Sequence, residues 1–82
     1  MDRKARLPDK LRGNPNNVSF EDLDKALLWC GFVCRHRGGS HYTYTRAGMP
    51  YPLTVPRHKP VKKHWVVAAL ARIEEFGDLE GD

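Results

Sequence analysis

The chain has 82 residues and a formal net charge of +4 at pH 7, which fits one small domain and excludes a large internal active-site cavity. Its two cysteines are too few for a disulfide scaffold, and no apolar stretch is long enough for a signal peptide or a membrane span. We therefore expect a cytoplasmic protein that does not insert into membranes.

The charge is unevenly distributed along the chain. All ten acidic residues fall within residues 2–24 or 74–82, and the span between them, 25–73, has none. The basic residues of that span are Lys25, Arg35, Arg37, Arg46, Arg57, Lys59, Lys62, Lys63 and Arg72. Such one-sided charge attracts polyanions, so it predicts nucleic acid or an acidic protein as the ligand. A solvated basic surface is the alternative, although ordinary solvated surfaces mix both signs.

Residues 1–17 are charged, contain two prolines and a glycine, and lack a long apolar stripe. This composition predicts a mobile or loosely docked N-terminal arm. At the other end, residues 78–82 are expected to form an acidic, frayed C-terminal tail. The domain itself is expected to span residues 18–77.

A first helix is expected over about residues 20–30. Ser19 is a suitable N-cap, and the acidic residues Glu21 and Asp22 lie in the first turn, where negative charge suits the helix dipole. Apolar residues recur at helical spacing at Phe20, Leu23, Ala26, Leu27 and Cys30. Gly31 supplies the C-terminal stop.

Three strands are expected after this helix. Residues 32–36 and 42–45 are rich in aromatic and β-branched residues and flank an Arg-Gly-Gly-Ser turn signal, which predicts a hairpin. Residues 51–56 form a third strand whose prolines suit the edge of a sheet. A second helix is predicted after Pro60 and ends at Gly77. Its apolar stripe consists of Trp65, Val66, Ala69, Leu70, Ile73 and Phe76.

The predicted fold class is α+β, in the order α-β-β-β-α, with both helices on one face of a three-stranded antiparallel sheet and the other face open to water. A three-residue loop, 38–40, pairs Arg37 with His41 and Arg35 with Thr43. Alternation then points one set of side chains inward, namely Phe32, Cys34, Tyr42, Tyr44, Leu53 and Val55. The outward set is Val33, Arg35, Arg37, His41, Thr43 and Thr54. His41 is therefore expected on the open face, at the start of a strand and next to arginines.

This arrangement suits attack on a phosphodiester. An exposed imidazole can accept and donate protons near neutral pH, and neighbouring cations can stabilise the charge that develops when phosphorus is attacked. The acid-free region cannot build the carboxylate cage that magnesium-dependent nucleases need. A metal-free reaction therefore needs a nucleophile that is already part of the substrate. The ribose 2′-hydroxyl is such a nucleophile, and DNA lacks it. We therefore predict RNA cleavage without metal or other cofactor, with His41 as catalytic acid or base, and no direct DNA binding by this chain alone.

Other residues have expected supporting roles. The residues predicted to contact RNA are Arg35, Arg37, Gly39, Ser40, His58, Lys59, Lys62 and Lys63. His36 is expected to face inward in a hydrogen-bonded structural role, and His64 to be an exposed helix residue. Trp29 and Trp65 are expected to fill gaps between helices and sheet. The spacing C-x3-C-x-H-x4-H over residues 30–41 does not match a zinc knuckle, so no metal site is predicted.

The order of motifs resembles the HicA-type toxins of bacterial toxin–antitoxin pairs. Over residues 18–76 the shared elements are a helix, a strand, Gly-Ser-His, an aromatic strand, Leu-Thr-Val-Pro-Arg-His-Lys and a closing helix, and the preceding Leu-Arg-Gly-Asn-Pro-Asn-Asn-Val-Ser-Phe resembles the longer members. The resemblance implies a fold similar to double-stranded-RNA-binding domains, mRNA interferase activity with His41 as catalytic residue, and a HicB-type antitoxin that masks the active face. Two positions depart from the usual pattern: His36 stands where arginine is common, and Tyr42 where a second histidine is common.

Two other functions fit the sequence. A non-catalytic double-stranded-RNA-binding module has the same α-β-β-β-α plan and reads duplex shape through phosphate and ribose contacts, in which case His41 is incidental. An adaptor for an acidic protein needs only the basic charge. Cleavage of RNA, but not of matched DNA, separates the enzyme from both.

Overall fold

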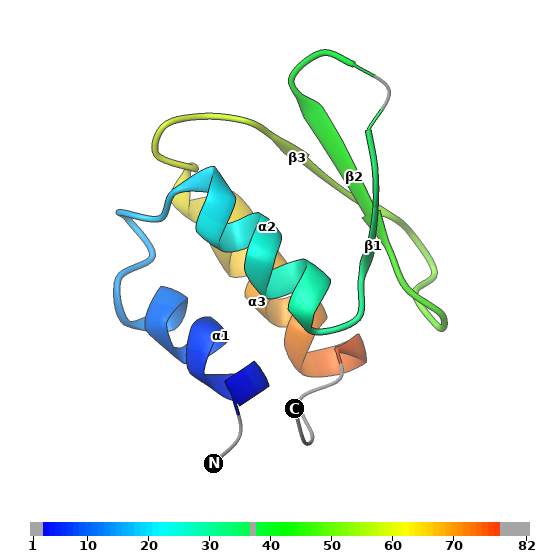
Figure 1. Ribbon diagram of the computed structural model, residues 1–82, viewed down its shortest axis with the longest axis horizontal. Coiled ribbons are helices and arrows are strands. Elements are labelled where there is room, and N and C mark those ends of the chain that lie inside the picture. The colour runs from blue at the N-terminus through cyan, green and yellow to red at the C-terminus, as the bar shows by residue number, and fades with distance from the viewer. Residues whose placement is uncertain (1–2, 37, 78–82) are drawn as a thin grey trace.

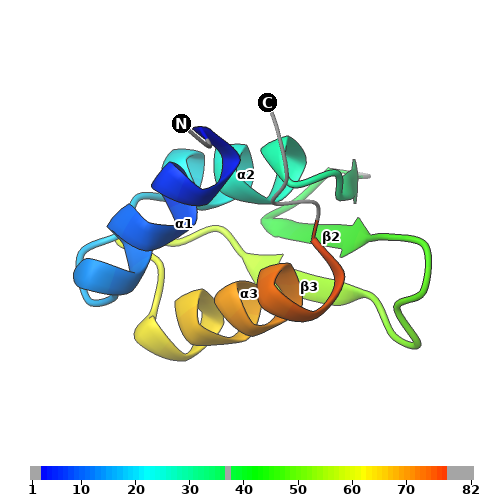
Figure 2. The same cartoon turned by 90° about the horizontal axis from the view of Figure 1, so that it is seen from below.

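The computed structural model describes residues 3–36 and 38–77. Its elements are α1 (Arg3–Gly13), α2 (Phe20–Trp29), β1 (Val33–Arg35), β2 (His41–Thr45), β3 (Leu53–Pro56) and α3 (Lys63–Phe76). The strands form one antiparallel sheet in the order β1-β2-β3, and α2 and α3 lie on the same side of it (Figure 1, Figure 2). The predicted α+β fold is confirmed, with one additional helix before it. None of the described helices is long and apolar enough to cross a membrane.

The predicted capping residues delimit α2. The Ser19 hydroxyl accepts a hydrogen bond from the Asp22 backbone N–H at 3.1 Å, which satisfies one of the unpaired N–H groups of the first turn. At the other end, the helix finishes at Trp29, and Gly31 follows with a φ of 95°. Glycine adopts this left-handed conformation at little cost, so the chain can turn here from the helix into β1.

β2 is the central strand of the sheet. It pairs with β1 through Arg35 opposite Thr43, and with β3 through His41 opposite Pro56. The predicted pairing of Arg35 with Thr43 is therefore confirmed, whereas the predicted partner of His41, Arg37, lies outside the described residues. β3 is an edge strand, as Pro56 and the preceding Pro52 indicate, because proline has no N–H to donate to a second neighbouring strand.

The core lies between the inner face of the sheet and the helices. Its buried side chains are Leu11, Val18, Phe20, Leu23, Ala26, Leu27, Cys30, Phe32, Tyr44, Leu53, Val55, Val61, Val66, Ala69, Leu70 and Ile73. Tyr44 is fully buried, and its hydroxyl donates to the Asp24 carboxylate of α2 at 2.6 Å. Burial, and then this hydrogen bond, raise the pKa of Tyr44, so the phenol stays protonated and joins the central strand to the helix.

The N-terminal segment differs from the predicted mobile or loosely docked arm. Residues Arg3–Gly13 form α1, which packs against both α2 and α3. Leu11 is 3% exposed and belongs to the main core, and Arg12 forms an ion pair with Glu74 of α3 at 3.1 Å. Docking rather than a long apolar stripe stabilises this helix, which is why the sequence pattern does not predict it.

The two tryptophans have different environments. Trp65 is partly buried and packs against the core, as predicted. Trp29 is 42% exposed and does not fill a gap between helices and sheet, so that prediction is wrong. As the last residue of α2, Trp29 projects from the helix beside Leu28, which is also exposed.

Replacing Leu11 with alanine tests the docking of α1. We expect Leu11→Ala to lower the free energy of unfolding by about 2–4 kcal/mol, because it removes a nearly fully buried side chain. Urea titration of the whole chain measures this change. Leu28→Ala, at a 46% exposed position of α2, is the matched control and should change the free energy of unfolding by no more than about 0.5 kcal/mol. An equally small effect of both substitutions would show that α1 is held only loosely.

Candidate active site

His41 is the first residue of β2, and its side chain is exposed. Because successive strand residues point to opposite faces, His41 and Thr43 lie on the outer face of the sheet, while Tyr42 and Tyr44 face the helices. The backbone that carries the imidazole is paired with Pro56 of β3. The predicted location of His41, at a strand start on the open face, is confirmed.

A shallow hollow of about 290 Å³ opens beside His41 on this face. We call it the outer hollow; its lining residues are Arg35, Gly38, His41 and Thr43. The fold thus brings a guanidinium and an imidazole from two adjacent strands to the same concave surface. Next to it, the hydroxyl oxygens of Thr43 and Thr54 lie 3.2 Å apart, so one of them donates to the other.

Acidic residues are absent from the described part of the sheet, whereas basic residues occur in both layers of the molecule. The described acidic residues are all helical, and they are Asp9, Glu21, Asp22, Asp24, Glu74 and Glu75. Within the described part of the chain, the side chains of Arg35 and His41 form no ion pair or hydrogen bond with each other or with other residues. The Arg35 guanidinium is therefore available to an anionic ligand in the outer hollow.

Other basic residues of the acid-free span have structural partners. Arg46 donates to the Gly31 carbonyl at 2.7 Å and to the Phe76 carbonyl at 2.8 Å, so it joins the end of α2 to the end of α3. Arg72 donates to the Tyr51 carbonyl at 3.3 Å. These two guanidinium groups stabilise the fold, and we do not assign them to ligand binding.

The two residues before His41 have backbone contacts that fix their carbonyl groups. A ring N–H of His36 donates from Nε2 to the Gly39 carbonyl at 2.8 Å. The backbone N–H of Arg57 donates to the Ser40 carbonyl at 2.6 Å. The predicted hydrogen-bonded role of His36 is therefore confirmed, and both Gly39 and Ser40 are exposed beside the outer hollow.

The remaining residues predicted to contact RNA do not line the outer hollow. They are exposed in the segment between β3 and α3 or at the start of α3, and they are His58, Lys59, Lys62 and Lys63. Because β3 ends at Pro56, opposite His41, this segment leaves the sheet beside the histidine (Figure 1). Arg37, also predicted to contact RNA, lies outside the described residues.

The cysteines and histidines do not assemble a metal site. Cys30 is buried, and burial, and then the nearby Asp24 carboxylate, raise the pKa of the Cys34 thiol. A protonated thiol is a poor metal ligand. No group of three or more histidine, cysteine or acidic side chains that could hold a metal ion occurs within residues 3–36 and 38–77.

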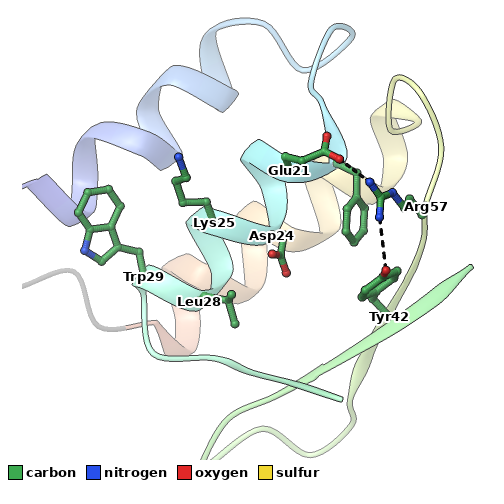
Figure 3. A pocket seen from close by; sticks show the side chains of 8 residues that line it. Glu21, Asp24, Lys25, Leu28, Trp29, Tyr42 and Arg57 are labelled. Carbon is green, nitrogen blue, oxygen red and sulfur yellow. Dashed lines mark hydrogen bonds and ion pairs between the residues drawn. The ribbon is translucent and has the colours of Figure 1, made fainter. Parts of the chain in front are cut away.

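A larger hollow, of about 620 Å³, lies on the other side of β2, against α2 (Figure 3). We call it the inner groove; its lining residues are Phe20, Glu21, Asp24, Lys25, Leu28, Trp29, Tyr42 and Arg57. At one end, the Arg57 guanidinium donates to Glu21 at 2.6 Å and to the Tyr42 hydroxyl at 3.5 Å. The sequence gives no signal for this groove, because its shape depends on how the helix and the strand diverge. Its lining includes no residue predicted to act in catalysis.

Comparison with known protein families identifies the family of the chain. Residues 20–74, which include α2, the whole sheet and most of α3, match the family described as HicA toxin of bacterial toxin-antitoxin. The chain belongs to the HicA toxin family. The resemblance of its motifs is thereby confirmed, and this HicA toxin carries both the outer hollow and the inner groove within the matched residues. Neither the search of curated proteins nor the search of solved structures gives a match.

Neutralising one charge on each side of this HicA toxin tests which face binds polyanions. We expect Arg35→Gln to weaken the binding of single-stranded RNA and to reduce the slope of log affinity against log salt by about 0.7, because one phosphate contact is lost. Lys25→Gln, on the inner groove, is the matched control and should leave both quantities unchanged. Fluorescence anisotropy at several salt concentrations, with every variant made in a His41→Ala background, provides the measurement. Equal losses in the two variants would contradict a binding surface confined to the outer face.

Proposed function

We propose that this HicA toxin is a metal-independent endoribonuclease that cleaves mRNA. The observation that carries the proposal is the exposed imidazole of His41, which shares the outer hollow with the Arg35 guanidinium on a sheet face where no described residue is acidic. Membership of the HicA family supports the role of a toxin that is paired with an antitoxin.

The proposed reaction is an intramolecular transfer at phosphorus. The ribose 2′-oxygen attacks the adjacent phosphorus and loses its proton, the bond from phosphorus to the 5′-oxygen breaks, and that oxygen gains a proton. The products are a cyclic phosphodiester and a free 5′-hydroxyl. Among the described residues that line the outer hollow, His41 is the one whose side chain can act as both a general acid and a general base, so we assign the proton transfer to it. Arg35 stabilises the additional negative charge on the phosphoryl oxygens.

The RNA backbone is proposed to extend from the outer hollow along the segment that follows β3. Arg35 holds the reacting phosphate, and Gly39 and Ser40 contact the neighbouring nucleotide. The flanking phosphates are assigned to Arg37, His58, Lys59, Lys62 and Lys63. Residues 18–77 form the cleaving unit on this proposal, since they contain every assigned group. α1 lies outside that unit and packs against its helices.

The protein partner is proposed to be a HicB-type antitoxin that covers the outer face. A partner seated there would occupy the outer hollow and exclude RNA from His41. Its contact surface should carry carboxylates, because the described sheet residues include basic but no acidic side chains.

A cleavage assay tests the proposed reaction. We expect the purified toxin to cut RNA but not matched DNA, with a chelator of divalent cations present throughout. His41→Ala should lower the rate by about 10²–10⁴-fold, because proton transfer is lost. His64→Ala, at an exposed histidine of α3, is the matched control and should cut at the wild-type rate. RNA that is bound but remains intact would support the non-catalytic RNA-binding module instead, and cleavage that stops on chelation would contradict a metal-independent reaction.

Expression in a host bacterium tests the biological role. In a bacterium without the cognate antitoxin, we expect the wild-type toxin to arrest growth and His41→Ala at the same protein level to be harmless. Co-expression of the antitoxin should restore growth. Colony counts after induction, with protein levels checked by immunoblot, give the result. Normal growth with abundant, folded wild-type toxin would argue against a toxic ribonuclease.

A further inference from the structure

The loop before His41 has two glycines whose backbone requires an external restraint. Gly38 and Gly39 have φ angles of 90° and 78°, and a Cβ atom placed on either would have no neighbour within 4 Å. Glycine loses more conformational freedom on ordering than any other residue, and it has no side chain through which the described core could hold it. A catalytic imidazole must nevertheless be held in place relative to its substrate. The restraint therefore has to act through backbone hydrogen bonds.

His36 supplies one of those hydrogen bonds. Its Nε2 N–H donates to the Gly39 carbonyl at 2.8 Å, across the turn that joins β1 to β2. The imidazole ring is itself fixed, because it stacks on the Tyr42 ring with centroids 3.9 Å apart and an angle of 1° between the planes. Tyr42 faces the helices, so His36 lies on the side of the sheet opposite His41 and cannot share its substrate. The hydrogen bond to Gly39 therefore reaches the loop from the inner side of the sheet, away from the outer hollow.

The stack is anchored to α2. The Tyr42 ring lies 4.6 Å from the ring of Phe20, which is buried at the start of the helix. The Tyr42 hydroxyl accepts from Arg57, and Arg57 also pairs with Glu21 (Figure 3). A hydrogen bond from its own backbone, and then the charge of Arg57, lower the pKa of Glu21, so the carboxylate stays ionised. The side chains from α2 to the loop form one continuous series of contacts.

We propose that His36 is a positioning residue for His41: its ring, held by Tyr42, fixes the Gly39 carbonyl and so orients the strand start that carries the catalytic imidazole. This proposal rests on the proposed ribonuclease function. It gives a joint role to His36 and Tyr42, since their rings stack on each other. His36 orders the loop and takes no part in proton transfer or in holding RNA.

Two substitutions distinguish the effect of the hydrogen bond from His36 to Gly39 from the effect of the stacking of His36 on Tyr42. His36→Phe keeps an aromatic ring on Tyr42 but cannot donate to Gly39, whereas His36→Gln keeps an N–H at a similar reach and loses the ring. Since His36 is exposed, both variants should fold, which circular dichroism checks. His64→Phe, at an exposed histidine on α3, controls for the added phenyl group.

We expect His36→Phe to lower kcat by about fivefold, the effect of one ordinary hydrogen bond on the ordered fraction of the loop, with KM within about twofold of wild type. His36→Gln should retain most of the activity, and His64→Phe all of it. A rise in KM with kcat unchanged would show that His36 binds RNA instead. Unchanged kinetics in His36→Phe, or equal loss in His36→Gln, would overturn the assignment of the hydrogen bond.

Backbone dynamics give a second measurement that does not depend on catalysis. NMR relaxation of the Gly38 and Gly39 amides should report rigid backbone in wild type and in His36→Gln, and an order parameter below about 0.6 in His36→Phe. Equal order in all variants would refute the positioning role. If wild type cuts no RNA at all, the proposed function fails, and the relaxation data alone decide whether His36 orders the loop.

Discussion

The burial of Tyr44 against α2 is the constraint on which the outer face depends. Its ring is completely enclosed, and its hydroxyl donates to the Asp24 carboxylate of α2. In a strand with a period of two, burying Tyr44 also places Tyr42 inward, and it forces His41 and Thr43 outward. A register shift of one residue would bury the imidazole and expose the tyrosine. The core, rather than any contact of its own, keeps His41 accessible.

The two sides of β2 have different tasks as a result. The outer side presents a guanidinium and an imidazole in a shallow hollow. The inner side carries the contacts from Glu21 through Arg57 and Tyr42 to His36, which hold the turn in front of His41. Arg57 serves both sides, because its side chain binds the helix while its backbone N–H holds the Ser40 carbonyl. A single residue after β3 thus connects the helix layer to the candidate site.

Local sequence signals were sufficient for much of this fold. The capping hydroxyl of Ser19 delimits α2, and the glycine-rich turn, combined with alternation, gives the pairing of Arg35 with Thr43. Features that depend on tertiary packing were not predictable in this way. α1 is stabilised by docking, with Leu11 in the core, and the exposure of Trp29 follows from the position at which α2 ends. The number of basic residues in span 25–73 also overstates the charge available to a ligand, because Arg46 and Arg72 bind backbone carbonyls.

The same limitation applies to the candidate site. His41 and its outward direction follow from strand period and motif order, since both are local properties. The stacking of His36 on Tyr42 joins a loop residue to a neighbouring strand, and nothing in the spacing of the two residues specifies parallel rings. The sequence distinguishes Arg57 in no way from the other basic residues. Its ion pair with Glu21, a residue of α2 far away in the chain, forms only in the folded protein.

The acidic side chains of α2 and the guanidinium of Arg35 lie on opposite sides of β2, which gives this part of the molecule a local electric dipole. A nearby polyanion would exert a torque on this dipole that turns the outer side of the strand toward it. Productive encounters would then form a larger share of all collisions than shape alone allows. Mobile ions shorten the range of that torque to about 8 Å at physiological ionic strength, so the association rate constant should fall as salt rises.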